Sequence, residues 1–513
     1  MVATQATFLL SYHPTVPLIF MNFGFLQLTE LRKLLDDKKI SSVELTKYFL
    51  SRIKKDDLNA FITVTEEEAL KDAKRADDFI NSPGENPFLC GIPYAAKDMY
   101  CTKGIRTTAG SKILDKYIPP YDSTVISKLK EQKTVLLGKN NQDQFAHGSS
   151  GESSAYGFTK NPWDKTRMSG GSTSGGGATV GAGLAPFALG TDTGGSIRNP
   201  ASHCGITGFK PTYGRVSRYG VVAMASSMDT QGFLCLSAED AAHITEFIAG
   251  HDPKDASTGE VDVPQYHKNL TANLKGLKVG IPKEYFVEGM EPGVEKRVRE
   301  AIKEVEKLGA KTEEVSLPNS HFGQMVYAII CPSEVSSNLA KYDGIRFGHV
   351  TKEAKDLMEV YTKSRGEGFG DEAKRRIMTG TYVLSAGYYD AYYKRAQKIR
   401  RLIVDEFAEV FKKVDVLLTP TCPYVAPKSG VAQNDPVFAY IADQLAVNCN
   451  LAGLPSLSIP CGFARPTDGE TPSSDGLPVG LQIIGPQWGE QKIFNVGYAY
   501  QQATDWHTKH PSP

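Results

Sequence analysis

The sequence lacks a charge excess and a long apolar run, and each absence excludes a class of protein. Its 513 residues include 58 Lys plus Arg and 58 Asp plus Glu, so the formal charges cancel. Balanced charge argues against broad attraction to nucleic acid or to an anionic membrane. No apolar run is long enough to span a bilayer. We therefore expect no membrane contact, and we expect any RNA to be held mainly by another subunit.

Cysteine is scarce and scattered. No two cysteines form a CxxC pair and none has metal-ligand spacing, so the sequence predicts buried thiols, a reducing compartment and no metal site. We expect a cytoplasmic location, or an organellar matrix if the source is eukaryotic. The eight cysteines are Cys90, Cys101, Cys204, Cys235, Cys331, Cys422, Cys449 and Cys461.

Residues 1–20 lack the features of a targeting segment. The first charged residue is Glu30, and neither a basic n-region nor a small-residue cleavage site precedes it. We interpret residues 1–20 as a weakly ordered N-terminal extension, which would make Met21 the initiator. A poor secretory or organellar signal is the alternative.

The length and composition predict a large core. A hydrophobic content of 41% excludes disorder for most of the chain, and the length suits two or three domains or one large α/β domain. Ser41 and Glu44 predict a capping box that begins a helix. Apolar spacing predicts helices near residues 26–35, 45–53, 66–80, 125–129, 294–308 and 392–410, and strands near 92–96, 135–138, 277–282, 315, 416–418, 457–459 and 481–484.

Lys97 follows a short apolar stretch, Ile92 to Ala96, that predicts a strand entering the interior. Most lysines are exposed, because burying an ammonium group is costly. The apolar approach favours a buried Lys97 without establishing it.

The segment from Ser169 to Val216 concentrates glycine and serine, with ten glycines between Gly170 and Gly195. Glycine lets main-chain N–H groups approach a ligand closely, at a cost in folding entropy. The small, apolar run from Gly181 to Leu189 fits close helix packing. The segment contains no G-K-[ST], so it is a poor candidate for a nucleotide-binding P-loop.

The sequence GTDTGGS, which ends at Ser196, predicts a tight turn. The successive N–H groups of Thr193, Gly194, Gly195 and Ser196 could converge on one oxygen, as an oxyanion hole requires. Ser196 is then a candidate nucleophile, but a protonated hydroxyl is nearly inert and needs a base. No G-x-S-x-G elbow surrounds it and no local histidine supplies that base.

The sequence GGSTSGG, followed by GTDTGGSIRNPASHCGITGFKPTYGRV, resembles the amidase signature family over residues 25 to the C-terminus. The Ser-cisSer-Lys triad of that family matches Lys97, Ser172 and Ser196. The resemblance implies an α/β/α amidase-signature fold in one domain over residues 21–513, with a large, mixed, mostly parallel sheet flanked by helices. It also implies that Ser172 relays a proton between Ser196 and a buried, neutral Lys97, while the turn at Thr193, Gly194 and Gly195 holds the oxyanion.

Within the family, the chain is most similar to the glutaminase A subunits of tRNA-dependent amidotransferases. KPTYGRVSRYGVVAMASSMD, SSNLAKYDGIRFG and NLAGLPSLSIPCG carry this similarity. It implies glutamine hydrolysis by an acyl-enzyme within a heterotrimer. Ammonia would pass to a B subunit, which would bind ATP, Mg and the tRNA, and a small C subunit would brace the pair. No cofactor is expected in this chain.

The resemblance also implies that Tyr327, Arg376 and Asp443 bind glutamine. An arginine can form two parallel hydrogen bonds to a carboxylate, and an aspartate can accept hydrogen bonds from an ammonium group. Each residue also has an ordinary structural interpretation. Arg376 ends a charged run that is typical of a solvated face, Tyr327 would suit a core, and Asp443 would suit a helix surface.

Several residues beside the predicted site depart from the usual family pattern, while the triad is intact. The family commonly reads GGSSGGS and DEFAMGSS where this chain reads GGSTSGG and DQFAHGSS. Two alternatives therefore stay open: a stand-alone amidase for aliphatic or aryl amides, and a catalytically silent scaffold subunit. The departing positions are Met99, Gln144, His147, Thr173, Ser174 and Phe233.

Overall fold

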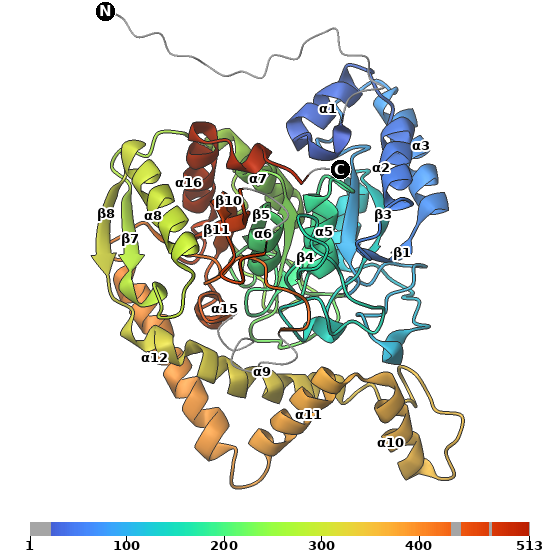
Figure 1. Cartoon of the computed structure of the whole chain (residues 1–513). Coiled ribbons are helices and arrows are strands. Elements are labelled where there is room, and N and C mark those ends of the chain that lie inside the picture. Colours follow the sequence, from blue (N-terminus) through green and yellow to red (C-terminus); the bar gives the residue numbers. More distant parts are fainter. Residues whose placement is uncertain (1–21, 432–442, 471–474, 512–513) are drawn as a thin grey trace, which may run out of the picture.

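The computed structural model describes residues 22–431, 443–470 and 475–511, so the predicted extension at 1–20 lies outside the described residues. Eleven strands form one sheet in the order β1-β3-β2-β4-β6-β5-β10-β11-β9-β7-β8, and helices flank it (Figure 1). The strands are β1 (Phe61–Val64), β2 (Pro93–Lys97), β3 (Val135–Asn140), β4 (Ala188–Asp192), β5 (Thr207–Lys210), β6 (Thr230–Cys235), β7 (Lys278–Pro282), β8 (Lys311–Val315), β9 (Val416–Pro420), β10 (Ser456–Ala464) and β11 (Leu477–Ile484).

The strand directions correct one part of the predicted fold. The large mixed sheet flanked by helices is confirmed, but the expectation that it is mostly parallel is wrong. Parallel pairs join β3, β2 and β4 at one end and β9, β7 and β8 at the other. The central run from β4 through β6, β5, β10 and β11 to β9 is antiparallel. A buried apolar strand has the same residue pattern whether it pairs parallel or antiparallel with its neighbours, so its sequence does not determine the direction of pairing.

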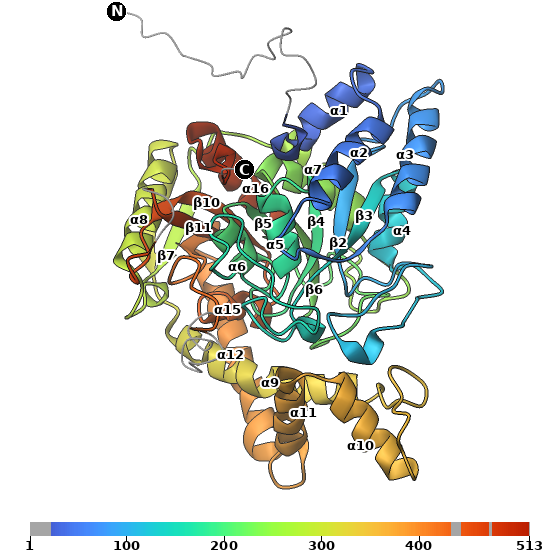
Figure 2. The same ribbon diagram turned by 45° about the vertical axis from the view of Figure 1, so that its right-hand side comes forward.

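Two groups of helices differ in position. Figure 2 shows α9, α10 and α11 together below the sheet, whereas α1, α2 and α3 lie at the end that carries β1, which Figure 1 labels. The helices are α1 (Leu28–Asp36), α2 (Ser42–Ile53), α3 (Glu66–Ile80), α4 (Thr124–Glu131), α5 (Ser174–Gly181), α6 (Arg198–Cys204), α7 (Ala238–Ile248), α8 (Pro292–Lys307), α9 (Gly323–Leu339), α10 (Leu357–Gly368), α11 (Asp371–Leu384), α12 (Arg395–Val410), α15 (Val447–Leu451) and α16 (Glu490–Ala503).

Local sequence signals place most of these elements. Ser41 accepts from the N–H of Glu44, whose carboxylate accepts in return, so the predicted capping box begins α2. The predicted helix at 66–80 is confirmed as α3. The run from Gly181 to Leu189 is not one helical packing surface, because α5 ends at Gly181 and β4 begins at Ala188.

All eight cysteines are buried and free, as the sequence predicts. Within the described ranges, no helix has both the length and the apolar character needed to cross a bilayer. The same ranges contain no group of three or more His, Cys, Asp or Glu side chains placed to hold a metal ion.

Candidate active site

Three segments bring Lys97, Ser172 and Ser196 together at one edge of the sheet. Lys97 ends β2, Ser172 shortly precedes α5, and Ser196 lies in the turn between β4 and α6. Because β2 and β4 are parallel neighbours, their carboxyl ends meet at this edge. The Nζ atom of Lys97 lies 2.7 Å from Ser172 Oγ, and the Gly171–Ser172 peptide bond is cis.

Ser196 is the member of this group that solvent reaches. It is 8% exposed, whereas Lys97 and Ser172 have no exposed area. Its carbonyl oxygen accepts from the N–H of Thr173 at 3.1 Å, which ties the turn at Ser196 to the residue after Ser172. A substrate that enters from solvent would meet Ser196 before Lys97 or Ser172.

Two threonine hydroxyls complete the surroundings of the lysine amine. Thr173 Oγ1 lies 3.0 Å and Thr191 Oγ1 lies 2.8 Å from Lys97 Nζ. Burial lowers the pKa of Lys97 to about 7, although nearby carboxylates, Asp143 foremost, act in the opposite direction. The neutral amine is therefore accessible close to neutral pH.

The directions of these hydrogen bonds fix the orientation of the neutral amine. Thr173 Oγ1 donates its proton to the carbonyl of Thr191 at 3.2 Å, and Thr191 Oγ1 donates to Met99 Sδ at 3.9 Å. Both hydroxyls must then accept from Lys97 Nζ. A neutral amine has two protons and one lone pair, so the lone pair remains for the Ser172 hydroxyl. Sequence analysis missed Thr191, and it treated Thr173 and Met99 only as departures from a pattern.

A buried ion pair shapes the turn before Ser196. The Asp192 carboxylate accepts from the N–H groups of Gly195 at 2.8 Å and Ile197 at 3.1 Å. It also pairs with Arg198, the nearest N···O distance being 2.9 Å, with no side-chain exposure on either residue. Burial alone would raise the pKa of Asp192, but the Arg198 guanidinium lowers it far below its usual range. Asp192 is therefore a permanent anion that holds this turn.

The same hydrogen bonds restrict which N–H groups can hold an oxyanion. The N–H of Gly195 is engaged by Asp192. By contrast, the N–H groups of Thr193, Gly194 and Ser196 donate to no acceptor within the described part of the chain. The side chain of Thr193 is fixed separately, because its hydroxyl donates to Asp229 at 2.7 Å. The turn therefore offers Thr193, Gly194 and Ser196, rather than Gly195, as oxyanion donors.

The three predicted substrate-binding residues lie around this turn. Tyr327 of α9 packs on Gly194, since a Cβ atom at Gly194 would lie 2.9 Å from Tyr327 Cζ. A Cβ atom at Gly195, whose φ is +127°, would lie 4.0 Å from Asp443 Oδ1. Arg376 of α11 is close enough to Asp443 to lower its pKa. The fold therefore gathers positions 327, 376 and 443 beside the predicted nucleophile.

Arg376 differs from its neighbours in the charged run. Its side chain is 12% exposed and its Nε lies 2.7 Å from Glu372 Oε1, whereas the side chain of Arg375 is 64% exposed. The interpretation of Arg376 as part of a solvated face is therefore wrong. Burial raises the pKa of Asp443 to about 7 even with Arg376 nearby, so its carboxylate is partly protonated at neutral pH.

Two departures from the usual pattern lie close to this group. The side-chain oxygen of Gln144 accepts from the N–H of Gly370 at 2.8 Å, at the start of α11. His147 is fully buried, and neither of its ring nitrogens has a hydrogen-bond partner among the described residues. Burial, followed by the charge of Arg376, holds the pKa of His147 well below its usual range. His147 is thus a neutral imidazole in the neighbourhood of Arg376.

The family described as Amidase matches residues 44–494, and the chain belongs to this family. Its relatives include proteins named as the A subunit of glutamyl-tRNA(Gln) amidotransferase. The one from Nitrosococcus oceani is 52% identical over 94% of this chain and 99% of its own length, and the one from Pseudomonas entomophila is 51% identical over 95% and 99%. The crystal structure of the Thermotoga maritima A subunit has a TM-score of 0.77 at 39% identity, covering 94% of this chain and 95% of that chain.

Proposed function

We propose that this chain is the glutaminase subunit of a tRNA-dependent amidotransferase. The observation that carries the chemistry is the 2.7 Å contact between Lys97 Nζ and Ser172 Oγ, whose side chains are both fully buried. The identity of about half of all positions with proteins named as amidotransferase A subunits supports the choice of substrate.

The reaction begins with proton transfer through Ser172. The lone pair of neutral Lys97 accepts the Ser172 proton as Ser172 accepts the proton of Ser196, and Ser196 Oγ attacks the side-chain amide carbon. The free N–H groups of Thr193 and Gly194 stabilise the oxyanion. The relay then returns a proton to the departing nitrogen, which leaves as ammonia. Water attacks the acyl-enzyme by the reverse proton path and releases glutamate.

Charge complementarity explains how a free α-amino acid would be held. Arg376 would bind the α-carboxylate and Asp443 would accept from the α-ammonium. Asp443 lies beside the turn that carries Ser196, so the two charges would fix the amide end of the substrate near the nucleophile. Tyr327 would form a wall of this site through its contact with Gly194.

The rest of the reaction belongs to other chains. A B subunit would bind the misacylated tRNA together with ATP and Mg, and would use the ammonia made here. A small C subunit would brace the pair. The relatives are named as A subunits, which supports a complex of several subunits.

The test is ammonia release from glutamine by the purified chain, alone and with its B and C partners. Ser196→Ala should abolish release. Ser336→Ala, which removes only a hydrogen bond to the carbonyl of Ser333 in α9, should leave it unchanged. Release that survives Ser196→Ala would contradict the triad. Rapid turnover of simple amides without partners, and poor turnover of glutamine with them, would favour a stand-alone amidase.

A further inference from the structure

A cavity of about 990 Å³ lies outside the active site. Residues between Lys112 and Tyr121, the turn Gly220–Val222 and the loop from Lys341 to Lys352 form its walls. The loop joins α9 to α10 and contains the end of the sequence SSNLAKYDGIRFG. The proposed reaction assigns no role to this sequence or to any residue that lines the cavity.

The walls carry an excess of positive charge. Asp115 is the single acidic side chain among the residues that line the cavity, and it already pairs with Arg106 at 2.5 Å. Asp343 belongs to the loop from Lys341 to Lys352 but does not line the cavity. Lys116 and Lys352 form no ion pair with any described residue, whereas Arg346 lies close to the Asp343 carboxylate, which accepts from the Arg346 N–H at 3.1 Å. An anion in the cavity would therefore meet two lysines, Lys116 and Lys352, that have no ion-pair partner among the described residues. The basic residues of the walls are Lys112, Lys116, Lys341, Arg346 and Lys352.

The walls also present aromatic rings. Phe347 is 50% exposed and Tyr121 is 40% exposed, although both line the same hollow. Tyr117 and Tyr342 add two further rings, and the hydroxyls of Tyr117 and Tyr121 contact the Cys101 thiol on the wall. Exposed rings beside unpaired cations suit a ligand that combines a flat ring with an anionic group.

The loop that forms one wall is fixed by hydrogen bonds. The N–H of His349 donates to the carbonyl of Ile113 at 2.6 Å. The N–H of Thr351 donates to Ser364 Oγ at 3.0 Å, and Arg365 donates to the carbonyl of Tyr342 at 2.9 Å. This wall therefore exists before any ligand binds, which reduces the entropy cost of binding.

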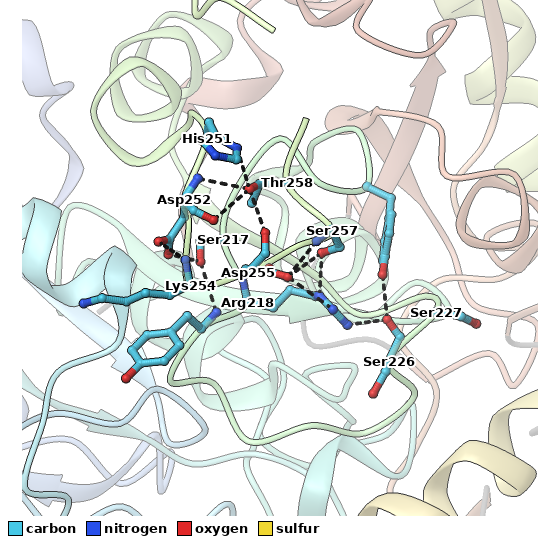
Figure 3. Close-up of polar contacts among 12 residues, drawn as sticks. Ser217, Arg218, Ser226, Ser227, His251, Asp252, Lys254, Asp255, Ser257 and Thr258 are labelled. Atoms are coloured by element: carbon cyan, nitrogen blue, oxygen red, sulfur yellow. Dashed lines mark hydrogen bonds and ion pairs between the residues drawn. The ribbon is translucent and has the colours of Figure 1, made fainter. Parts of the chain in front are cut away.

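The segment before the turn Gly220–Val222 is fixed as well. Ser217 Oγ donates to Asp252 at 2.6 Å, and the N–H of Arg218 donates to Asp255 at 2.7 Å. Figure 3 shows these contacts within a larger polar network that also includes Ser257 and Thr258. Gly220–Val222 follow directly on this anchored segment.

We propose that this cavity binds a nucleotide, with its phosphate held by the unpaired cations and its base stacked on the exposed rings. The volume lies at the upper end of the roughly 300 to 1,000 Å³ that is typical of small-molecule sites. A phosphate alone would leave the aromatic wall unused, and an uncharged ring would leave the cations unused.

Calorimetry with the full chain tests this directly, using AMP, adenosine, inorganic pyrophosphate and a short single-stranded RNA as separate probes. AMP should bind at least about tenfold more tightly than adenosine or pyrophosphate, because only AMP engages both kinds of group. Equal affinity for pyrophosphate and AMP would overturn the proposal, and so would binding of the RNA without binding of AMP.

Two variants locate the site. Arg346→Ala should weaken AMP binding by about tenfold, and Phe347→Ala should do the same. Both side chains are exposed, so the chain should still fold. Lys398→Ala on α12 and Phe79→Ala on α3 are the matched exposed controls, and they should bind AMP normally. Loss of binding in the controls, or retention in both cavity variants, would overturn the assignment.

Discussion

The hydroxyl of Thr191 accepts a hydrogen bond from Lys97 Nζ at 2.8 Å. The register of the sheet creates this contact, because β2 and β4 are parallel and Ala96 faces Leu189. Lys97 and Thr191 follow these partners by one and two residues. The amine is therefore oriented from the neighbouring strand as well as by the glycine-rich segment.

Replacing Thr191 with valine should slow catalysis without unfolding the chain. The substitution keeps the shape but removes the acceptor that helps to direct the Lys97 lone pair at Ser172. We expect kcat to fall roughly 10- to 100-fold, within the range of general acid–base effects, with little change in KM. Steady-state kinetics with the assembled complex measure this.

Thr245→Val is the matched control. Thr245 is also fully buried, but its hydroxyl donates to the carbonyl of Ala241 inside α7, away from the site. Equal losses of kcat in both variants would point to a general packing effect and would contradict the orienting role of Thr191.

The reactivity of Ser196 should rise with pH through about 7. Lys97 must be neutral to accept a proton, and burial places its pKa at about 7. Below that pH the ammonium form dominates, so the rate should fall about tenfold for each pH unit. Asp443 also has a pKa of about 7. Its ionisation above that pH would strengthen glutamine binding, so both groups would make glutamine hydrolysis rise with pH.

The rate of Ser196 labelling by a fluorophosphonate distinguishes the effect of Lys97 from that of Asp443. That reagent lacks the α-amino acid charges that Asp443 would bind, so only Lys97 should set the pH dependence of labelling. Labelling of the Asp443→Asn variant should keep the same pH dependence, whereas Lys97→Met should label very slowly at every pH. A labelling rate that is flat from about pH 6 to 8 would contradict the assignment of Lys97 as base.

An alanine at position 194 should damage the oxyanion turn by a purely steric route. Its Cβ would lie 2.9 Å from Tyr327 Cζ, closer than packed carbon atoms approach. The turn would have to move, so kcat should fall roughly 100- to 1,000-fold, as when one oxyanion donor is lost. Adding Tyr327→Ala should restore part of kcat by removing the clash, even if KM for glutamine stays high. No recovery in the double variant would argue against this mechanism.

Replacing His147 with methionine should stabilise the folded chain. Both ring nitrogens of His147 are buried and have no partner in the part of the chain that the structure describes, and each unsatisfied buried polar group costs about 1 to 3 kcal/mol. Methionine fills a similar volume without that cost. Urea unfolding at pH 7 should give a higher midpoint for His147→Met, while the exposed control His321→Met should be neutral. A lower midpoint for His147→Met would mean that the ring is satisfied by an ordered water.

The same substitution should reduce acid sensitivity. Since burial depresses the pKa of His147 in the folded state, the unfolded chain binds a proton below about pH 6.5 that the folded chain does not. The wild-type free energy of unfolding should therefore fall as pH drops below that value. His147→Met should lose less stability over the same range, measured by unfolding at several pH values.

The sequence by itself determined the local chemistry. Ser41 and Glu44 mark the start of α2, the apolar residues before Lys97 predict β2, and GTDTGGS predicts the turn at Ser196, because each signal acts over a few neighbouring residues. The similarity to a known family then matched Lys97, Ser172 and Ser196, which lie far apart in the chain.

Only the tertiary structure decided how these pieces meet. It made the centre of the sheet antiparallel, placed the Thr191 hydroxyl against the lysine amine, and engaged the N–H of Gly195 with Asp192. It also buried Arg376 while leaving Arg375 in solvent. Strand direction, strand register and burial depend on contacts between distant residues, and a local sequence pattern is compatible with several such arrangements.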